Sequence, residues 1–171
     1  MKQHVSQQQG FTLIELLLYV SIAAALLLAS SVFLSTLLQS RIKNQTIAEV
    51  EGQGAAALQV IAQSIRNANG INAPSSGSNA STLSLAVDSA GNDPTVFDVA
   101  SGVLRMKEGA STATSLTNSR VVVTNLVFSN LSRSGTLGTV RIGFTVTATN
   151  TSGRNEYSFS KDFVMSATLR Q

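Results

Sequence analysis

The most prominent feature of the hydrophobic pattern is one long apolar segment near the start of the chain. Residues 1–10 (MKQHVSQQQG) are polar, and FTLIELLLYVSIAAALLLASSVFLSTLLQS follows at once. From Leu16 to Leu38 this segment contains no charged side chain. A helix needs about 20 apolar residues to cross the hydrocarbon core of a bilayer, so the segment predicts one membrane-spanning helix. Its serines and threonines can donate to carbonyls of their own helix and so do not oppose insertion.

A second apolar pattern, with helical spacing, follows this segment. Apolar or small residues recur mostly at steps of three or four, which is typical of one stripe on an amphipathic helix. They are Ile42, Ile47, Val50, Gly54, Leu58, Ile61, Ile65 and Ala68. Gly52 and Gly54 each cost about 1 kcal/mol relative to alanine in a helix, so they indicate a bend or close packing. Asn69-Gly70 is a stop signal, so we expect one helix from about Phe11 to about Ala68, which the glycines could interrupt.

From residue 83 onward the hydrophobic pattern alternates with a period of two, as in β-strands. The Ser-, Asn- and Gly-rich residues 70–82 predict a loop. The expected strands are 83–87, 95–99, 103–107, 120–128, 139–149 and 156–169, with hairpin turns at 100–102 and 150–155. In strand 139–149 one face carries Val140, Ile142, Phe144, Val146 and Ala148. A sheet with one apolar face can cover the second half of the helix, so we predict an α+β fold with a long N-terminal helix packed on an antiparallel β-sheet.

Composition narrows the functional classes. Only 12% of the 171 residues are charged, about half the usual fraction in a soluble domain, and the polar uncharged remainder suits an extracellular β-rich surface. The absence of cysteine excludes disulfides, zinc–thiolate sites and thiol catalysis. Lysines and arginines are scattered singly and tryptophan is absent, so direct nucleic-acid binding is not expected despite the net charge of +3.

No catalytic or metal-binding pattern is recognisable in the sequence. His4 is the only histidine and lies in the polar N-terminal segment. Asp88, Asp93 and Asp98, with Asn92, invite a calcium interpretation, but their spacing does not match an EF-hand loop, and turn residues beside strands explain them better. We therefore expect no enzymatic activity, no cofactor and no metal ion.

Glu15 is the unusual residue of the apolar segment. A carboxylate at membrane depth costs roughly 2.5–3.5 kcal/mol on insertion scales and usually marks a function. An interfacial residue near the helix end is the equal alternative, because the cost is low there. For the whole segment, a secretory signal peptide cleaved near Ala29–Ser31 is the rival interpretation, although such a signal has a shorter apolar core.

The sequence GFTLIELLLYV at Gly10–Val20 closely resembles the class III signal of type IV prepilins and type II secretion pseudopilins. The resemblance rests on the unbroken row GFTLIEL at Gly10–Leu16, ahead of a full-length apolar segment. In that family a membrane-embedded prepilin peptidase cleaves after the glycine and then methylates the new N-terminal amine. The resemblance implies cleavage between Gly10 and Phe11, N-methylation of Phe11 and an assembly role for Glu15, which matches the family's acidic residue.

The resemblance also implies a division of the chain and a set of partners. Residues 1–10 would be a cleavable leader, 11–39 the transmembrane and polymerisation helix, 40–69 its amphipathic extension and 70–171 an antiparallel β-sheet globular domain. The partners would be other pilin or pseudopilin subunits, prepilin peptidase, an inner-membrane assembly platform and, before assembly, membrane lipid. The chain would cross the cytoplasmic (inner) membrane once and then enter a cell-surface filament, with its globular domain outside the cytoplasm.

Cleavage would leave a positive amine at Phe11 and a negative carboxylate at Glu15. Each charge is costly alone in hydrocarbon and needs a partner. In the family the glutamate is thought to pair with the N-terminal amine of a neighbouring subunit, which would register the subunits along the filament. One departure is visible, because many pilins carry a proline in the membrane half of the helix and this chain has none before Pro74. We expect a less kinked helix here.

These expectations lead to one hypothesis and two rivals. The hypothesis is a structural subunit of a type IV pilus-like filament, with a minor pilin or pseudopilin favoured, because the strand 121–131 and the long final hairpin are similar to PilW-like or J-type minor subunits. The first rival is a membrane-tethered or secreted binding module that does not polymerise, in which Gly10 and Glu15 could be replaced without loss of localisation. The second is an exported hydrolase, for which the sequence offers no basis.

Overall fold

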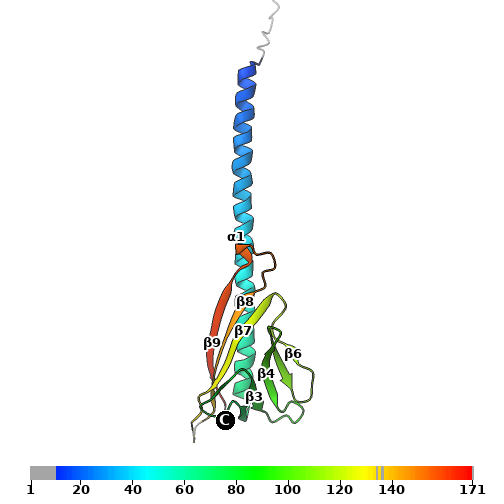
Figure 1. The fold of residues 1–171 in the computed structure, drawn as a ribbon, viewed down its shortest axis with the longest axis vertical. Coiled ribbons are helices and arrows are strands. Elements are labelled where there is room, and N and C mark those ends of the chain that lie inside the picture. Colours follow the sequence, from blue (N-terminus) through cyan, green and yellow to red (C-terminus); the bar gives the residue numbers. More distant parts are fainter. Residues whose placement is uncertain (1–10, 134, 136, 171) are drawn as a thin grey trace, which may run out of the picture. The chain divides into compact units, whose positions relative to one another are not determined.

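The computed structural model describes residues 11–133, 135 and 137–170, so the predicted leader, including Gly10, lies outside the described residues. One long helix is followed by antiparallel strands (Figure 1). The elements are α1 (Leu13–Asn67), β1 (Gly70–Ala73), β2 (Asn79–Ala80), β3 (Leu83–Ala86), β4 (Thr95–Ala100), β5 (Val103–Glu108), β6 (Thr114–Ser115), β7 (Val121–Asn130), β8 (Thr139–Ala148), the 3-10 helix η1 (Asn155–Tyr157) and β9 (Ser160–Thr168). Contacts divide the chain into two compact units, one ending at Arg41 and one beginning at Ile42.

Backbone hydrogen bonds mark both ends of α1. The carbonyl of Thr12 accepts hydrogen bonds from the backbone N–H groups of Glu15 (3.1 Å) and Leu16 (3.2 Å), which closes the first turn. At the other end the N–H of Asn69 donates to the carbonyl of Ala86 (2.8 Å), so the chain leaves the helix and enters β1. The helix predicted from about Phe11 to about Ala68 is confirmed, and the glycines do not interrupt it.

The strands form two antiparallel sheets rather than the single one that the alternation suggested. Among the described residues one sheet has the order β1-β3-β4-β5-β6 and the other has the order β2-β7-β8-β9. Both predicted hairpins are present, because β4 pairs with β5 and β8 pairs with β9. Ser101 and Gly102 turn the first hairpin with φ of 51° and 76°, the left-handed conformation that a two-residue hairpin turn needs at both positions. The predicted α+β class is confirmed, and period-two alternation identifies strand faces without identifying the sheet to which each strand belongs.

The expectation that residues 70–82 are all loop is wrong. This segment contains β1 and β2, which are short and rich in residues with low strand propensity. Partners elsewhere in the chain hold them, since β1 pairs with β3 and β2 pairs with the end of β7. The two-residue strand β6 was also missed, and the final strand begins at Ser160 after η1 rather than at residue 156.

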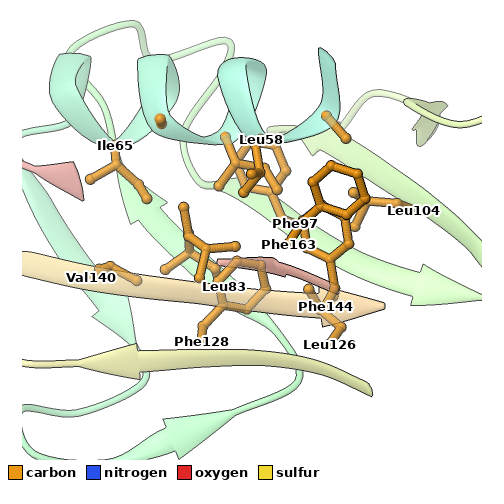
Figure 2. Close-up of a cluster of buried hydrophobic side chains, with 14 of the residues drawn as sticks. Leu58, Ile65, Leu83, Phe97, Leu104, Leu126, Phe128, Val140, Phe144 and Phe163 are labelled. Atoms are coloured by element: carbon orange, nitrogen blue, oxygen red, sulfur yellow. The ribbon is translucent and has the colours of Figure 1, made fainter. Parts of the chain in front are cut away.

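The core of the second unit lies between α1 and both sheets. In Figure 2, Leu58 and Ile65 of the helix point toward side chains from the strands, among them Phe97, Phe128 and Val140. The predicted helical stripe is buried from Val50 to Ala68, whereas Ile42 and Ile47 before it are half-buried. The predicted face of β8 is also buried in four of its five positions: Val140, Ile142, Phe144 and Val146.

Gly54 and Gly52 have different surroundings within the same helix turn. A Cβ added at Gly54 would lie 2.2 Å from Cζ of Phe163, so the ring of β9 occupies the space that the glycine leaves. Phe163 in turn stacks on Phe144, with ring centroids 5.6 Å apart. A Cβ at Gly52 would meet nothing within 4 Å. Gly54 therefore permits close packing of helix on sheet, and Gly52 does not serve this purpose.

Candidate assembly site

Phe11, Glu15 and Tyr19 lie at successive four-residue steps, Phe11 just before α1 and the other two in its first turns. Side chains four residues apart on an α-helix are neighbours on one face. Glu15 is in the first turn of α1, where a carboxylate interacts favourably with the helix dipole. The phenol hydroxyl of Tyr19 points its donor at Oε1 of Glu15 across 3.5 Å, longer than the usual O–H···O distance of about 2.5–3.0 Å. The rings of Phe11 and Tyr19 are in tilted contact, with centroids 5.8 Å apart.

The aliphatic hydroxyls of the same helix bond differently. Four of them donate to a backbone carbonyl three or four residues earlier, at 2.8–3.1 Å. These donors are Ser21, Ser30, Ser35 and Thr36. Such local bonding satisfies a polar group in an apolar environment without a second helix, as the sequence predicted.

The large apolar side chains of this helix segment have no core of their own. From Phe11 to Leu38 the large hydrophobic residues that are exposed are 50–78% accessible. By length and composition α1 is apolar enough to cross a membrane, and none of its most apolar window is buried. A surface of this size and composition needs lipid or other apolar helices around it.

Comparison with known proteins identifies the segment that contains these residues. Residues 5–31 match the family model of the prokaryotic N-terminal methylation motif. This segment is a class III signal of the prepilin type. The match supports a type IV pilin-like or pseudopilin-like character for this N-terminal segment, a motif that implies peptidase processing and assembly with other pilin subunits. No curated protein and no solved structure gives a significant match to the chain.

The signal and the apolar helix together fit membrane anchoring before assembly into a surface filament. Of the predicted site residues, Phe11 and Glu15 lie within the described chain, and Tyr19 links them through its ring and its hydroxyl. Gly10 lies outside the described residues. The processing of Gly10 and Phe11 and the assembly role of Glu15 stay predictions. Tyr19 was missed, although its four-residue spacing from Glu15 was a signal that could have identified it.

The second unit has a groove beside its part of α1. This open groove of about 790 Å³ is lined by residues of α1, by Ser119 and Arg120 just before β7, by the end of β8 and by Tyr157 of η1. Its carboxylate, Glu49, already accepts a hydrogen bond from Nδ2 of Asn118 (2.7 Å) and lies 3.8 Å from Nη1 of Arg120. The groove therefore gathers no reactive set of titratable groups.

The aspartates considered for calcium have other roles in the fold. Oδ1 of Asp93 accepts the N–H of Val87 at 3.1 Å, and Asp98 forms a salt bridge with Arg105 at 2.7 Å. This hydrogen bond with Asp98 raises the pKa of Arg105. Asp88 accepts a hydrogen bond from Nδ2 of Asn69. Within the described part of the chain, no group of His, Cys, Asp or Glu residues could hold a metal ion.

Proposed function

We propose that this protein is a structural subunit, a minor pilin or pseudopilin, of a type IV pilus-like filament. The observation that carries the proposal is the prepilin-type signal at residues 5–31, which leads directly into an apolar helix with its side chains exposed. Exposed apolar helices of this kind can pack side by side in a polymer once they leave the lipid. No enzymatic role is proposed, because the matched motif is that of a structural pilin type.

Processing would convert the start of the chain into an assembly terminus. Prepilin peptidase would cleave between Gly10 and Phe11 and methylate the new amine of Phe11. The amine of one subunit would then pair with the Glu15 carboxylate of its neighbour, because each charge is costly alone in an apolar environment. The charge pair would set the axial register, and the apolar helices would supply most of the packing energy.

The proposed location follows from the same segment. The chain would be held in the cytoplasmic (inner) membrane by residues 11–39 and extracted by an assembly platform into the filament. Residues 40–69 would continue the helix into a domain completed by residues 70–171 outside the cytoplasm. The long β7–β8–β9 sheet supports a minor-subunit layout, and this finer assignment rests on that layout alone.

Mass spectrometry of the N-terminus tests the processing step. The protein is recovered from sheared surface filaments of cells that carry the export apparatus, and its terminal peptide is sequenced. The expected terminus is N-methylated Phe11, because the resemblance to prepilin signals implies cleavage after Gly10. An intact Met1, or a terminus near Ser30 as for a secretory signal peptide, contradicts the proposal.

Replacement of the Glu15 carboxylate tests the assembly step. Glu15→Ala should lower the amount of protein in filaments at least tenfold. Without the carboxylate, the neighbour's N-terminal amine would be unpaired, and a charge at membrane depth costs roughly 2.5–3.5 kcal/mol. Quantitative immunoblotting of sheared filaments against membranes measures the ratio. Glu51→Ala makes the same chemical change on the same helix beyond the apolar segment and should leave the ratio close to that of the wild type. Normal incorporation of Glu15→Ala would favour a tethered module that does not polymerise.

A further inference from the structure

We propose that Tyr19 is a positioning residue for Glu15: its hydroxyl is the hydrogen-bond partner of the carboxyl group while the chain lies in the membrane. The inference rests on the proposed function, in which Glu15 receives the amine of a neighbouring subunit. It adds a residue that neither the methylation signal nor the charge-pair argument requires. The contact joins Tyr19 Oη and Glu15 Oε1 across one helix turn.

The geometry of the first two turns holds the phenol in place. Phe11 and Tyr19 are in ring contact at 5.8 Å, and Glu15 lies between them in sequence at the same four-residue step. A tilted aromatic contact at this distance is favourable and limits the rotamers of both rings. The ring of Tyr19 is therefore anchored on the side of the helix that carries the carboxylate.

Tyr19 differs from the serines and threonines of the segment in the acceptor that its hydroxyl can reach. A serine or threonine hydroxyl is close to its own backbone and donates to the preceding turn, as it does at Ser21 and Ser30. A phenol hydroxyl lies at the end of a rigid ring, too far from its own helix carbonyls for the same bond. It can reach a long side chain one turn earlier, and a glutamate is the residue found there.

The contact between Tyr19 and Glu15 should stabilise the carboxyl group more in lipid than in water. A polar group in hydrocarbon has no solvent to bond with, so an internal donor lowers the cost of holding the carboxyl group there. A carboxylate has two oxygens and several acceptor positions, so it can keep the phenol bond and still accept a neighbour's amine. The Tyr19 hydroxyl would thus fix the direction of the carboxylate before docking and remain beside it afterwards.

Tyr19→Phe is the sharpest variant, because it keeps the ring and the Phe11 contact and removes only the hydroxyl. Ser21→Ala is the matched control, since it removes a hydroxyl that is satisfied by Leu18 in the same segment. The processed full-length chain is placed in lipid bilayers, and infrared difference spectra against Glu15→Gln identify the carboxyl band of Glu15. Incorporation into filaments is measured in parallel by co-expression with the wild-type chain.

Tyr19→Phe should shift the Glu15 band and lower incorporation about threefold, the size of a typical hydrogen bond between side chains inside a membrane. Ser21→Ala should change neither. An unshifted band in Tyr19→Phe overturns the proposal, as does wild-type incorporation despite a shifted band. A loss of incorporation with an unshifted band shows a packing role for the ring and also overturns it.

The proposed function has its own separate readout. It fails if Glu15→Ala enters filaments normally, whatever Tyr19→Phe does to the infrared band. If Glu15→Ala is excluded from filaments while Tyr19→Phe matches the wild type in infrared band and incorporation, the proposed filament function is supported and the proposed role of Tyr19 is wrong. The two failures therefore give different results in the same pair of experiments.

Discussion

The two units of this protein use the same apolar side chains in opposite ways. Phe33 in the first unit is 66% exposed, and Phe97 in the second is fully buried. Leu27 and Ile61 lie on one continuous helix, at 72% and 0% exposure. In the second unit the sheets cover the helix, whereas among the described residues the large apolar side chains of the first unit stay exposed. The second unit thus has a core made with its own strands, and the first presents its apolar side chains on its surface.

The contrast separates folding from assembly along one helix. Burial of apolar area stabilises the second unit whether or not the chain is in a filament. The exposed area of the first unit contributes nothing to the folding of the domain and is available for membrane insertion and for packing between subunits. Substitutions in the second unit's part of α1 should therefore change the stability of the domain, and substitutions in the first unit's part should change incorporation into filaments.

Ile61→Ala against Leu27→Ala is the strongest test of this separation. Ile61 is fully buried against the strands, so its truncation should lower the free energy of unfolding of the domain by about 2–5 kcal/mol. Leu27 is exposed, so its truncation should change that free energy by less than about 0.5 kcal/mol. Urea denaturation of the detergent-solubilised chain, followed by circular dichroism, measures both.

The comparison breaks if the two variants have similar effects. A large loss of domain stability in Leu27→Ala would mean that the apolar segment packs on the domain. Filament incorporation is the converse measurement. Leu27→Ala should lower the amount of protein in filaments and leave the urea unfolding transition unchanged.

The sequence predicted those features that local pattern determines. The helix and its stripe from Val50 to Ala68 follow from three- and four-residue spacing, and the buried face of β8 follows from strict alternation. The methylation signal was readable because it is a continuous row of residues. In each case the physical cause lies within a few residues of the feature.

Features that depend on remote partners could not be predicted. β1 and β2 are strands only because β3 and β7 offer edges to pair with, so their own composition indicated a loop. The contact of Tyr19 with Glu15 had a spacing signal, but it depends on rotamers that the ring of Phe11 helps to hold. The helical stripe includes Gly54 and not Gly52, but the close approach of the Phe163 ring to Gly54 depends on a strand more than 100 residues away and could not be predicted.

This pair of glycines gives a smaller test, with effects of opposite sign, within the second unit. Gly52→Ala adds a methyl group in open space and should raise the free energy of unfolding by about 0.5–1 kcal/mol, because alanine favours the helix. Gly54→Ala places its Cβ 2.2 Å from the ring of Phe163, which is held by its stacking on Phe144. Overpacking should lower the free energy by about 1–3 kcal/mol in the same urea experiment.

The cause can be isolated with a second substitution at the ring. Phe163→Leu removes the ring atoms that the new methyl group would meet, so in that background Gly54→Ala should no longer destabilise the domain. The resulting coupling energy measures the contact, because both single variants enter the same cycle. If Gly54→Ala instead stabilises the wild-type domain as much as Gly52→Ala does, the ring yields freely and helix and sheet are not locked at this point. The helix of the second unit would then pack less tightly on its sheet, and the difference in packing between the two units would be smaller.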